Sequence, residues 1–212
     1  MTAEIIKINP DNPDPRMIAY VAERIKAGHV AGMPTDTFYG LAADPLNLRA
    51  VDFIYEVKSR NRHKPLSLLI ESVEQAEYLA RPLPEAFYEI ANKFWPGPLT
   101  IIVKASPRLP LKVTANTGNV ALRLPAASIP VEVIRAAGVP ITATSANISG
   151  ASECTTAEGV REQLGQRVDL IVDGGTSPRE IASTIIDMSD DHHCILLRQG
   201  AVSESELSEF LH

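Results

Sequence analysis

The chain has 212 residues, which is long enough to bury a sizeable core without a disulfide or metal. Hydrophobic residues make up 45% of it and charged residues 22%, which excludes long disorder, collagen-like repeats and coiled coils. The net charge of −6 argues against a general nucleic-acid coat, which would be basic. No apolar stretch approaches a membrane span, no signal peptide is visible and the two cysteines make no disulfide framework, so we expect a cytoplasmic protein with no membrane partner.

Short apolar runs alternate with helical patterns along the chain, which favours a layered α/β or α+β domain. In chain order we expect strands at residues 4–8, 29–33, 66–70, 99–103, 120–124, 141–145, 168–172, 184–188 and 194–198. Helices are expected to begin near residues 14, 47, 72, 84, 128, 156 and 203. No internal repeat, low-complexity tract or linker interrupts this order, so we expect one domain over residues 1–212.

Capping residues mark the ends of several predicted helices. Asp14 is followed by Pro15, which favours a helix start there, and Gly28 marks its end. Ser72 and Gln75 have the spacing of a capping box, in which the two side chains and two backbone N–H groups at a helix start satisfy one another.

Common nucleotide-binding and hydrolase signatures are absent from the sequence. The chain has no G-x-x-x-x-G-K-[ST] phosphate loop, no G-x-G-x-x-G fingerprint and no G-x-S-x-G segment. His192, His193 and Cys194 lie together, but no second cluster supplies the remaining ligands of a zinc site. We therefore predict a polar turn there and no metal site.

Four basic residues are concentrated within seven positions: Lys58, Arg60, Arg62 and Lys64. One interpretation is a solvated helix end, where cations meet the negative end of the helix dipole. The other is an anion site, because residues two apart in extended chain point the same way and these four side chains would line one wall. A polyphosphate would suit such a wall, since charge-assisted bonds to phosphate oxygens are strong.

Two further groups of polar side chains lie on or beside predicted strands. Arg123 is either an edge arginine facing solvent or an arginine at a concave sheet face that holds a carboxylate bidentately. Ser145 and Asn147 are either an ordinary turn or polar groups at the carboxyl edge of a sheet, where ligands bind in open α/β sheets.

Seven segments in order resemble the motifs of the YrdC-like family of threonylcarbamoyl-adenylate synthases, and the resemblance spans roughly residues 15–200. They are P-T-D-T-F-Y-G-L at 34–41, K-S-R at 58–60 with K-P-L at 64–66, W-P-G-P-L-T at 95–100, A-L-R-L-P at 121–125, S-A-N-I-S-G at 145–150, S-T-I-I-D at 183–187 and R-Q-G at 198–200.

The resemblance implies a twisted, mixed open sheet with helices packed around it and a large, concave, positively lined cavity. It also implies an enzyme that joins L-threonine, bicarbonate or CO2, and ATP into threonylcarbamoyl-adenylate and pyrophosphate. The product would feed the transferase machinery that makes threonylcarbamoyladenosine in tRNA. We expect the short, single-domain type of the family.

The same resemblance assigns roles by matching position. ATP contacts are implied for Lys58, Arg62, Asn119, Ser145, Asn147 and Arg198. Threonine contacts are implied for Thr35, Ser67, Arg123, Ala143 and Ser183. Catalytic charge stabilisation is implied for Lys58, Arg60 and Lys64. Mg2+ is expected with ATP, held mainly by phosphates and water, and Asp36 is a weak candidate ligand.

The main alternative is a non-catalytic RNA-binding or ribosome-maturation factor of the same fold. The net charge of −6 counts against strong RNA affinity, although weak RNA binding is compatible with it. A carbamoyl-transfer module like that of hydrogenase maturation proteins is a third possibility, but the chain has no room for the extra regions which those proteins carry.

Overall fold

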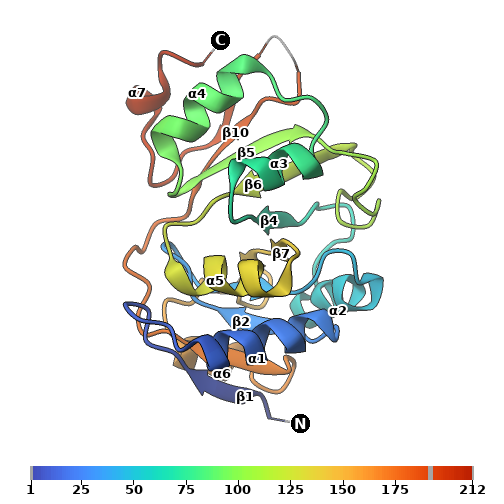
Figure 1. Ribbon diagram of the computed structural model, residues 1–212, viewed down its shortest axis with the longest axis vertical. Helices are drawn as coiled ribbons and strands as arrows, with labels where there is room; N and C mark the ends of the chain where they lie inside the picture. The colour runs from blue at the N-terminus through green and yellow to red at the C-terminus, as the bar shows by residue number, and fades with distance from the viewer. Residues whose placement is uncertain (1, 191–192, 212) are drawn as a thin grey trace.

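The computed structural model describes residues 2–190 and 193–211. The chain forms a mixed α/β structure with two open sheets, one in the lower half of Figure 1 and the other in the upper half. The first sheet has the strand order β1 (Glu4–Lys7), β9 (Leu170–Asp173), β2 (Ala31–Met33), β3 (Gly40–Ala42) and β8 (Thr144–Ser145). The second has the order β11 (Ile195–Arg198), β10 (Thr184–Asp187), β5 (Leu99–Lys104), β6 (Asn119–Arg123), β4 (Ser67–Leu69) and β7 (Ile141–Thr142).

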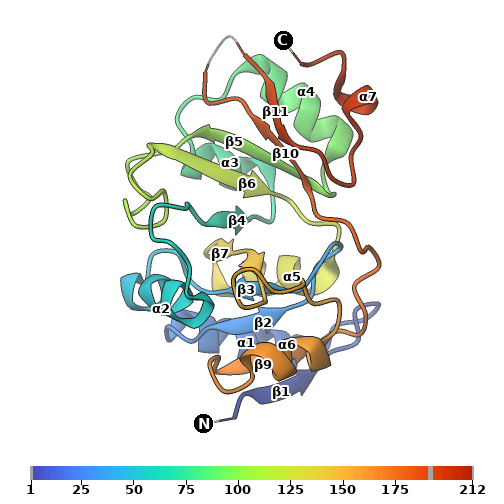
Figure 2. The same ribbon diagram turned by 180° about the vertical axis from the view of Figure 1, so that it is seen from behind.

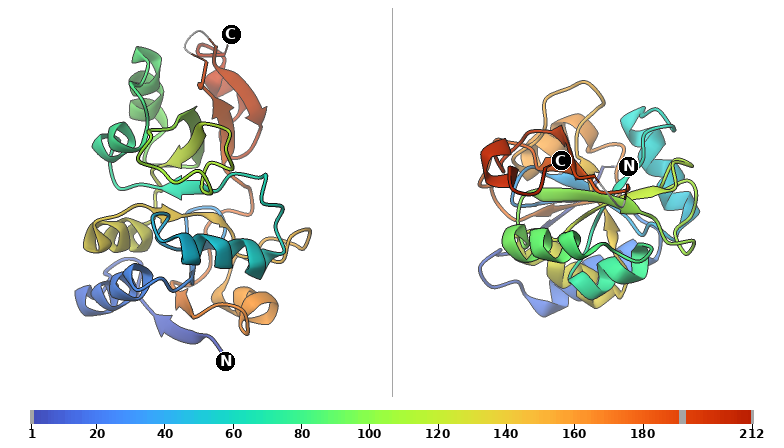
Figure 3. Two further views of the ribbon diagram at one scale, coloured as in Figure 1. Left: turned by 90° about the vertical axis from the view of Figure 1, so that its right-hand side faces the viewer. Right: turned by 90° about the horizontal axis from the view of Figure 1, so that it is seen from above.

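Helices cover both sides of the sheets. They are α1 (Pro15–Lys26), α2 (Leu48–Lys58), α3 (Val73–Leu79), α4 (Glu85–Phe94), α5 (Ser128–Ala137), α6 (Ala157–Leu164) and α7 (Glu204–Leu207). The side view in Figure 3 shows α1, α3, α4 and α5 on one side, with α2 and α6 on the other. Within the described part of the chain, no helix has the length and apolar character that a membrane crossing requires.

The expectation of a single sheet was wrong, because the predicted strand at 141–145 divides between two sheets. β7 pairs with β4 of the second sheet, whereas β8 pairs with β3 of the first. At the crossing point, the Ala143 N–H donates to the Ser67 carbonyl at 2.8 Å. Figure 2 shows β7 directly above β3. This short β3, which starts at a glycine, was not predicted either.

The predicted helix boundaries are largely confirmed. The Asp14 side chain accepts a hydrogen bond from the Arg16 N–H at the start of α1. At α3, Ser72 accepts from the Gln75 N–H, but the Gln75 side chain accepts from the Glu71 N–H instead of completing a box with Ser72. At the start of α7, Ser203 and Glu206 form a complete capping box.

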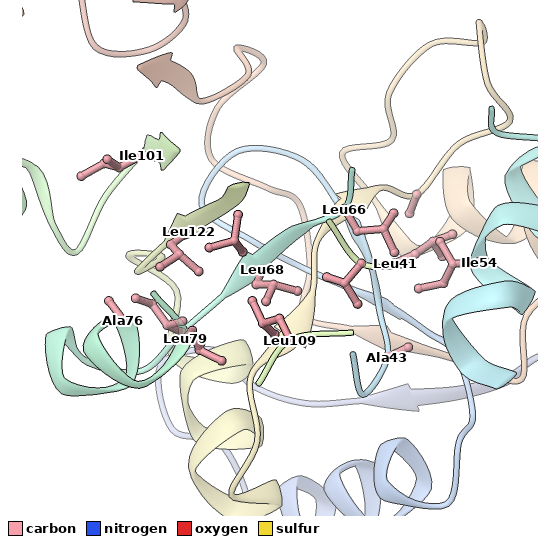
Figure 4. Close-up of a cluster of buried hydrophobic side chains, with 14 of the residues drawn as sticks. Leu41, Ala43, Ile54, Leu66, Leu68, Ala76, Leu79, Ile101, Leu109 and Leu122 are labelled. Atoms are coloured by element: carbon pink, nitrogen blue, oxygen red, sulfur yellow. The ribbon is translucent and has the colours of Figure 1, made fainter. Parts of the chain in front are cut away.

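Buried apolar side chains join the two sheets. Figure 4 shows Leu41 of β3 close to Leu68 of β4, with Ile54 of α2 and Leu79 of α3 on either side. All four side chains are buried. Full burial of a leucine or isoleucine contributes about 1.5–3 kcal/mol, so these contacts hold the two sheets at a fixed separation.

Thr184 at the start of β10 ties the end of the chain to the second sheet. Its buried hydroxyl donates to the Val202 carbonyl at 2.5 Å and accepts from the Gly200 and Val202 N–H groups. We expect Thr184→Val to lower the free energy of unfolding by about 2–4 kcal/mol, because three backbone groups lose a partner at roughly 1–3 kcal/mol each, with partial rescue by water. Urea unfolding measures this; the exposed Thr2→Val is the control, and equal stabilities would contradict the assignment.

Candidate active site

A pocket of about 210 Å³ lies between the two sheets and takes its walls from both of them. Gly40 and Ser145 come from the first sheet, whereas Thr100, Arg123 and Arg198 come from the second. Of the residues predicted from the sequence, the pocket brings together Thr35, Arg60, Ser67, Arg123, Ala143, Ser145, Ser183 and Arg198. Every residue to which the resemblance assigned a threonine contact is in this set.

Arg123 is buried at the end of β6, and three protein oxygens hold its guanidinium. Nε donates to the Gly97 carbonyl at 3.0 Å, Nη1 to Thr37 Oγ1 at 2.9 Å and Nη2 to Asp36 Oδ1 at 2.5 Å. A guanidinium has five N–H groups, so these contacts leave two for a ligand in the pocket. Of the two interpretations of Arg123, the solvent-facing edge residue is therefore wrong.

The electrostatics of Arg123 depend on Asp36. Burial lowers the pKa of the guanidinium, while the carboxylate beside it acts in the opposite direction. An arginine stays protonated in a protein, so the pair is a fixed buried charge couple. Asp36 does not line this pocket and its Oδ1 is engaged by Arg123, so it is poorly placed to bind a Mg2+ ion that enters the pocket with ATP.

Lys58 is the last residue of α2, and its ammonium lies behind the pocket wall. Nζ donates to the main-chain carbonyls of Ser145 and Asn147, and to Oδ1 of Asn147. These three acceptors match the three N–H groups of an ammonium. Lys58 thereby fixes the loop that follows β8, and a direct contact with ATP, as predicted, would require these bonds to be exchanged for phosphate oxygens.

The Lys58 ammonium is expected to titrate at an unusual pH. Burial, with a smaller contribution from Arg60, lowers its pKa to about 8. In the unfolded chain the pKa of this lysine is near 10.5. Between about pH 8 and 10.5 the unfolded state therefore binds more protons than the folded state. The contribution of Lys58 to the free energy of unfolding consequently rises with pH across that window. NMR of lysine labelled at Cε measures the pKa directly, with the exposed Lys26 as control; a midpoint equal to that of Lys26 would contradict the burial.

Arg198 and Ser183 also line the pocket, and they meet where β10 and β11 lie side by side. The Arg198 guanidinium donates to the Ser183 carbonyl at 2.8 and 3.2 Å. The Ser183 hydroxyl lies 2.9 Å from Thr100 Oγ1 on β5. A cation and two hydroxyls therefore line the same small space as Arg123 and Thr35.

The prediction that four basic residues line one wall was wrong. The helix continues to residue 58, and Ser59 then takes a left-handed conformation with φ of 51°, so the chain turns before it can extend. Arg60 reaches the pocket, and burial lowers its pKa. Arg62 instead pairs with Asp52 at 2.6 Å on the outer face of α2, and Lys64 is exposed outside the pocket.

Asn119 also lies apart from the pocket. It begins β6 and Arg123 ends that strand, so four steps of about 3.3 Å separate them by roughly 13 Å. Both side chains emerge from the same face of the sheet, because side chains alternate along a strand. A ligand long enough to reach from Arg123 toward Asn119 could follow this face.

Among the described residues, no three His, Cys, Asp or Glu side chains gather as a metal site would require. Of the three residues considered for zinc, His192 lies outside the described residues. His193 pairs with Asp190 at 3.1 Å, and Cys194 is buried.

Among the lining residues that sequence reasoning missed are four polar ones: Thr37, Tyr39, Thr100 and Glu153. Three of them belong to the quoted motifs, so the motif boundaries could have identified them. Thr37 and Thr100 contact predicted site residues, while the Tyr39 hydroxyl donates to the Gly175 carbonyl and burial raises its pKa to about 12. Glu153 lies in a loop and had no sequence signal.

Comparisons with known proteins identify the family of the chain. Residues 23–200 match the Sua5, YciO and YrdC family, which is described as "Telomere recombination". The threonylcarbamoyl-AMP synthase of Pyrococcus abyssi is 38% identical over 92% of this chain and 57% of its own length. That of Marinobacter nauticus is 33% identical over 84% of this chain and 94% of its own length. The chain thus spans little more than half of some relatives and nearly all of others.

Solved structures show the same fold. The crystal structure of P. abyssi Sua5 complexed with L-threonine superposes with a TM-score of 0.93 at 36% identity, over 97% of this chain and 60% of that one. The crystal structure of E. coli YciO superposes with a TM-score of 0.88 at 25% identity, over 99% of this chain and all of the other. The chain belongs to the Sua5, YciO and YrdC family.

Proposed function

We propose that the chain is an L-threonylcarbamoyl-adenylate synthase, which condenses L-threonine, bicarbonate or CO2, and ATP. The observation that carries the proposal is the pocket itself, which gathers Arg123, Arg198 and Arg60 with the hydroxyls of Thr35 and Ser183. Relatives that carry the name threonylcarbamoyl-AMP synthase, one of them crystallised with L-threonine, support this substrate.

Arg123 would hold the threonine carboxylate. The two N–H groups that remain after its contacts with Gly97, Thr37 and Asp36 suit a bidentate carboxylate. Thr35, Ser67 and Ser183 would bind the amino acid's polar groups, and the Ala143 backbone would complete the wall. A small pocket with several converging donors fits a small amino acid better than a larger one.

The nucleotide would enter from the side of Ser145 and Arg198. The loop at 145–147, which Lys58 holds from behind, would bind it at the edge of β8. The pocket is then the innermost part of a larger, concave, positively lined cavity, whose mouth takes the adenosine. Three residues with predicted roles lie outside this innermost part: Asn119, Arg62 and Lys64. They would act in binding or catalysis only if the ligand or a loop reached beyond the pocket.

The reaction brings two anions together. A carbamate oxygen, formed when the threonine amine adds to CO2 and loses a proton, attacks the α-phosphorus of ATP, and the bond to the pyrophosphate oxygen breaks. Arg60 and Arg198 would offset the repulsion between carbamate and phosphates, and would stabilise the departing pyrophosphate. Holding the reactants in one pocket removes much of the entropic barrier.

Mg2+ is expected to arrive with ATP. Glu153 is the carboxylate that lines this pocket in the described chain, and Mg2+ is usually bound by one or two carboxylates together with phosphates and water, so the residues fit. The ion would neutralise charge on the β- and γ-phosphates. The product would pass to the enzymes that transfer the threonylcarbamoyl group to adenosine in tRNA.

The direct test follows pyrophosphate release from the purified chain with ATP, Mg2+ and bicarbonate. Release that depends on added L-threonine supports the synthase. Absence of release with every amino acid tested, while the chain binds RNA, would overturn it in favour of the RNA-binding factor. D-threonine tests whether release depends on the configuration of the amino acid, and L-valine tests whether it depends on the side-chain hydroxyl.

A further inference from the structure

A second cavity, of about 460 Å³, lies beside the first and is not used by the proposed reaction. Its walls are the segments that follow β1, β2 and β9, which run parallel to one another, together with the start of α5. It therefore sits at the carboxyl edge of parallel strands, where open α/β sheets bind ligands. Thr35 lines both cavities, whereas Asp36 lines the second one.

Two buried polar atoms in the lining of this second cavity have no hydrogen-bond partner. They are Oδ2 of Asp36 and Oγ of Ser177, in residues that are 4% and 5% exposed. The other carboxylate oxygen of Asp36 is engaged by Arg123. A buried polar group that lacks a hydrogen bond costs about 1–3 kcal/mol. Both atoms therefore indicate a ligand that forms the missing hydrogen bonds.

The start of α5 supplies a third polar feature. Ala127 precedes the helix and offers no side-chain cap, while Pro130 has no N–H of its own. The first backbone N–H groups of a helix have no acceptor within it and carry partial positive charge. This end of α5 therefore attracts the negative end of a ligand into the cavity.

The charges around the cavity select among ligand classes. In the described chain, no lysine or arginine lines it, whereas Asp11 and Asp36 bring carboxylates, which disfavours a simple anion. The helix end in turn disfavours a simple cation. Pro34, Ala127 and Pro178 form a small apolar wall.

We propose that this cavity binds a small zwitterionic amino acid, with its ammonium on Oδ2 of Asp36 and its carboxylate at the start of α5 and the Ser177 hydroxyl. The apolar wall accommodates a short side chain. The proposal does not depend on the synthase activity, because it rests on groups that do not line the first pocket; Asp36 touches that pocket only through its other oxygen, which Arg123 engages.

The test is a titration of the 15N-labelled chain with L-alanine, followed by NMR. We expect saturable shifts of the Ser128, Ile129 and Ser177 amides. Ser177→Ala should weaken binding about three- to tenfold, the loss of one hydrogen bond. Ala127→Trp, which fills the cavity, should abolish the shifts. Acetate and methylamine, each carrying half of the zwitterion, should bind at least about tenfold more weakly than L-alanine.

Four results would overturn the proposal. The first is the absence of saturable shifts at these amides, which would mean that water alone hydrogen-bonds to Asp36 and Ser177. The second is L-alanine binding that is unchanged in both variants. The third is shifts confined to Ser67 and Ser183 in the first pocket. The fourth is acetate binding as tight as that of L-alanine, which would indicate a simple anion site. A negative pyrophosphate assay would leave this test unaffected.

Discussion

Arg123→Lys is expected to weaken L-threonine binding about 10- to 100-fold. The native guanidinium satisfies Gly97, Thr37 and Asp36 with three N–H groups and keeps two for the substrate. An ammonium has three N–H groups in all, so a lysine that held the same protein oxygens would have none left for a carboxylate. Isothermal titration with L-threonine measures the change, and the exposed Arg161→Lys on α6 is the matched control.

Lysine is the better replacement because it keeps a positive charge beside Asp36. Arg123→Ala would leave that carboxylate buried and uncompensated, at a cost of about 3–5 kcal/mol in folding stability, and so would confuse unfolding with lost binding. Thermal unfolding should therefore rank the wild type first, the lysine variant next and the alanine variant last. Threonine affinity unchanged in Arg123→Lys would contradict the carboxylate assignment.

Lys58→Met is expected to disorder the loop at 145–147 and to weaken ATP binding at least about tenfold. The thioether has the length of the lysine stem but no N–H, so three acceptors lose the ammonium. The Ser145 carbonyl keeps the Asn147 N–H and Asn147 Oδ1 keeps the Ser145 hydroxyl, but the Asn147 carbonyl is left without a donor. The free energy of unfolding should fall by about 1–2 kcal/mol, since one unsatisfied buried acceptor costs roughly 1–3 kcal/mol and removal of the buried charge returns part of that cost. ATP binding and urea unfolding measure the two effects.

Hydrogen exchange separates a positioning role of Lys58 from direct phosphate contact. The Ala146 N–H donates to the Tyr39 carbonyl at 2.8 Å, so its exchange reports on the loop without nucleotide. Faster exchange in Lys58→Met supports positioning, and Lys26→Met on the surface of α1 is the control. Native exchange and stability together with lost ATP binding would indicate that the ammonium contacts phosphate alone.

Helices were the most predictable part of the fold because their signals are local. Asp14 with Pro15, and Ser203 with Glu206, each place a cap within four residues of the helix that it starts. Strand pairing depends on residues far apart in the chain. Nothing within residues 141–145 indicates that the segment changes sheet at Ala143, because that change is set by contacts with β3 and β4.

The candidate site likewise has parts that the sequence predicted and parts that it did not. The resemblance implied threonine contacts for both Arg123 and Ser183, and the structure brings the two residues to one pocket. The spacing of the basic residues was misleading because Lys58 still belongs to a helix, and the left-handed Ser59 redirects the side chains beyond it. The pairing of Arg123 with Asp36, 87 residues away, could not be derived from either segment alone.

A crystal structure with L-threonine and a non-hydrolysable ATP analogue tests the central claim most directly. The account predicts the threonine carboxylate within hydrogen-bond distance of the Arg123 terminal nitrogens, and the α-phosphate between it and the edge of β8 at Ser145. Threonine bound away from Arg123, or nucleotide bound on a surface that does not share this pocket, would contradict it.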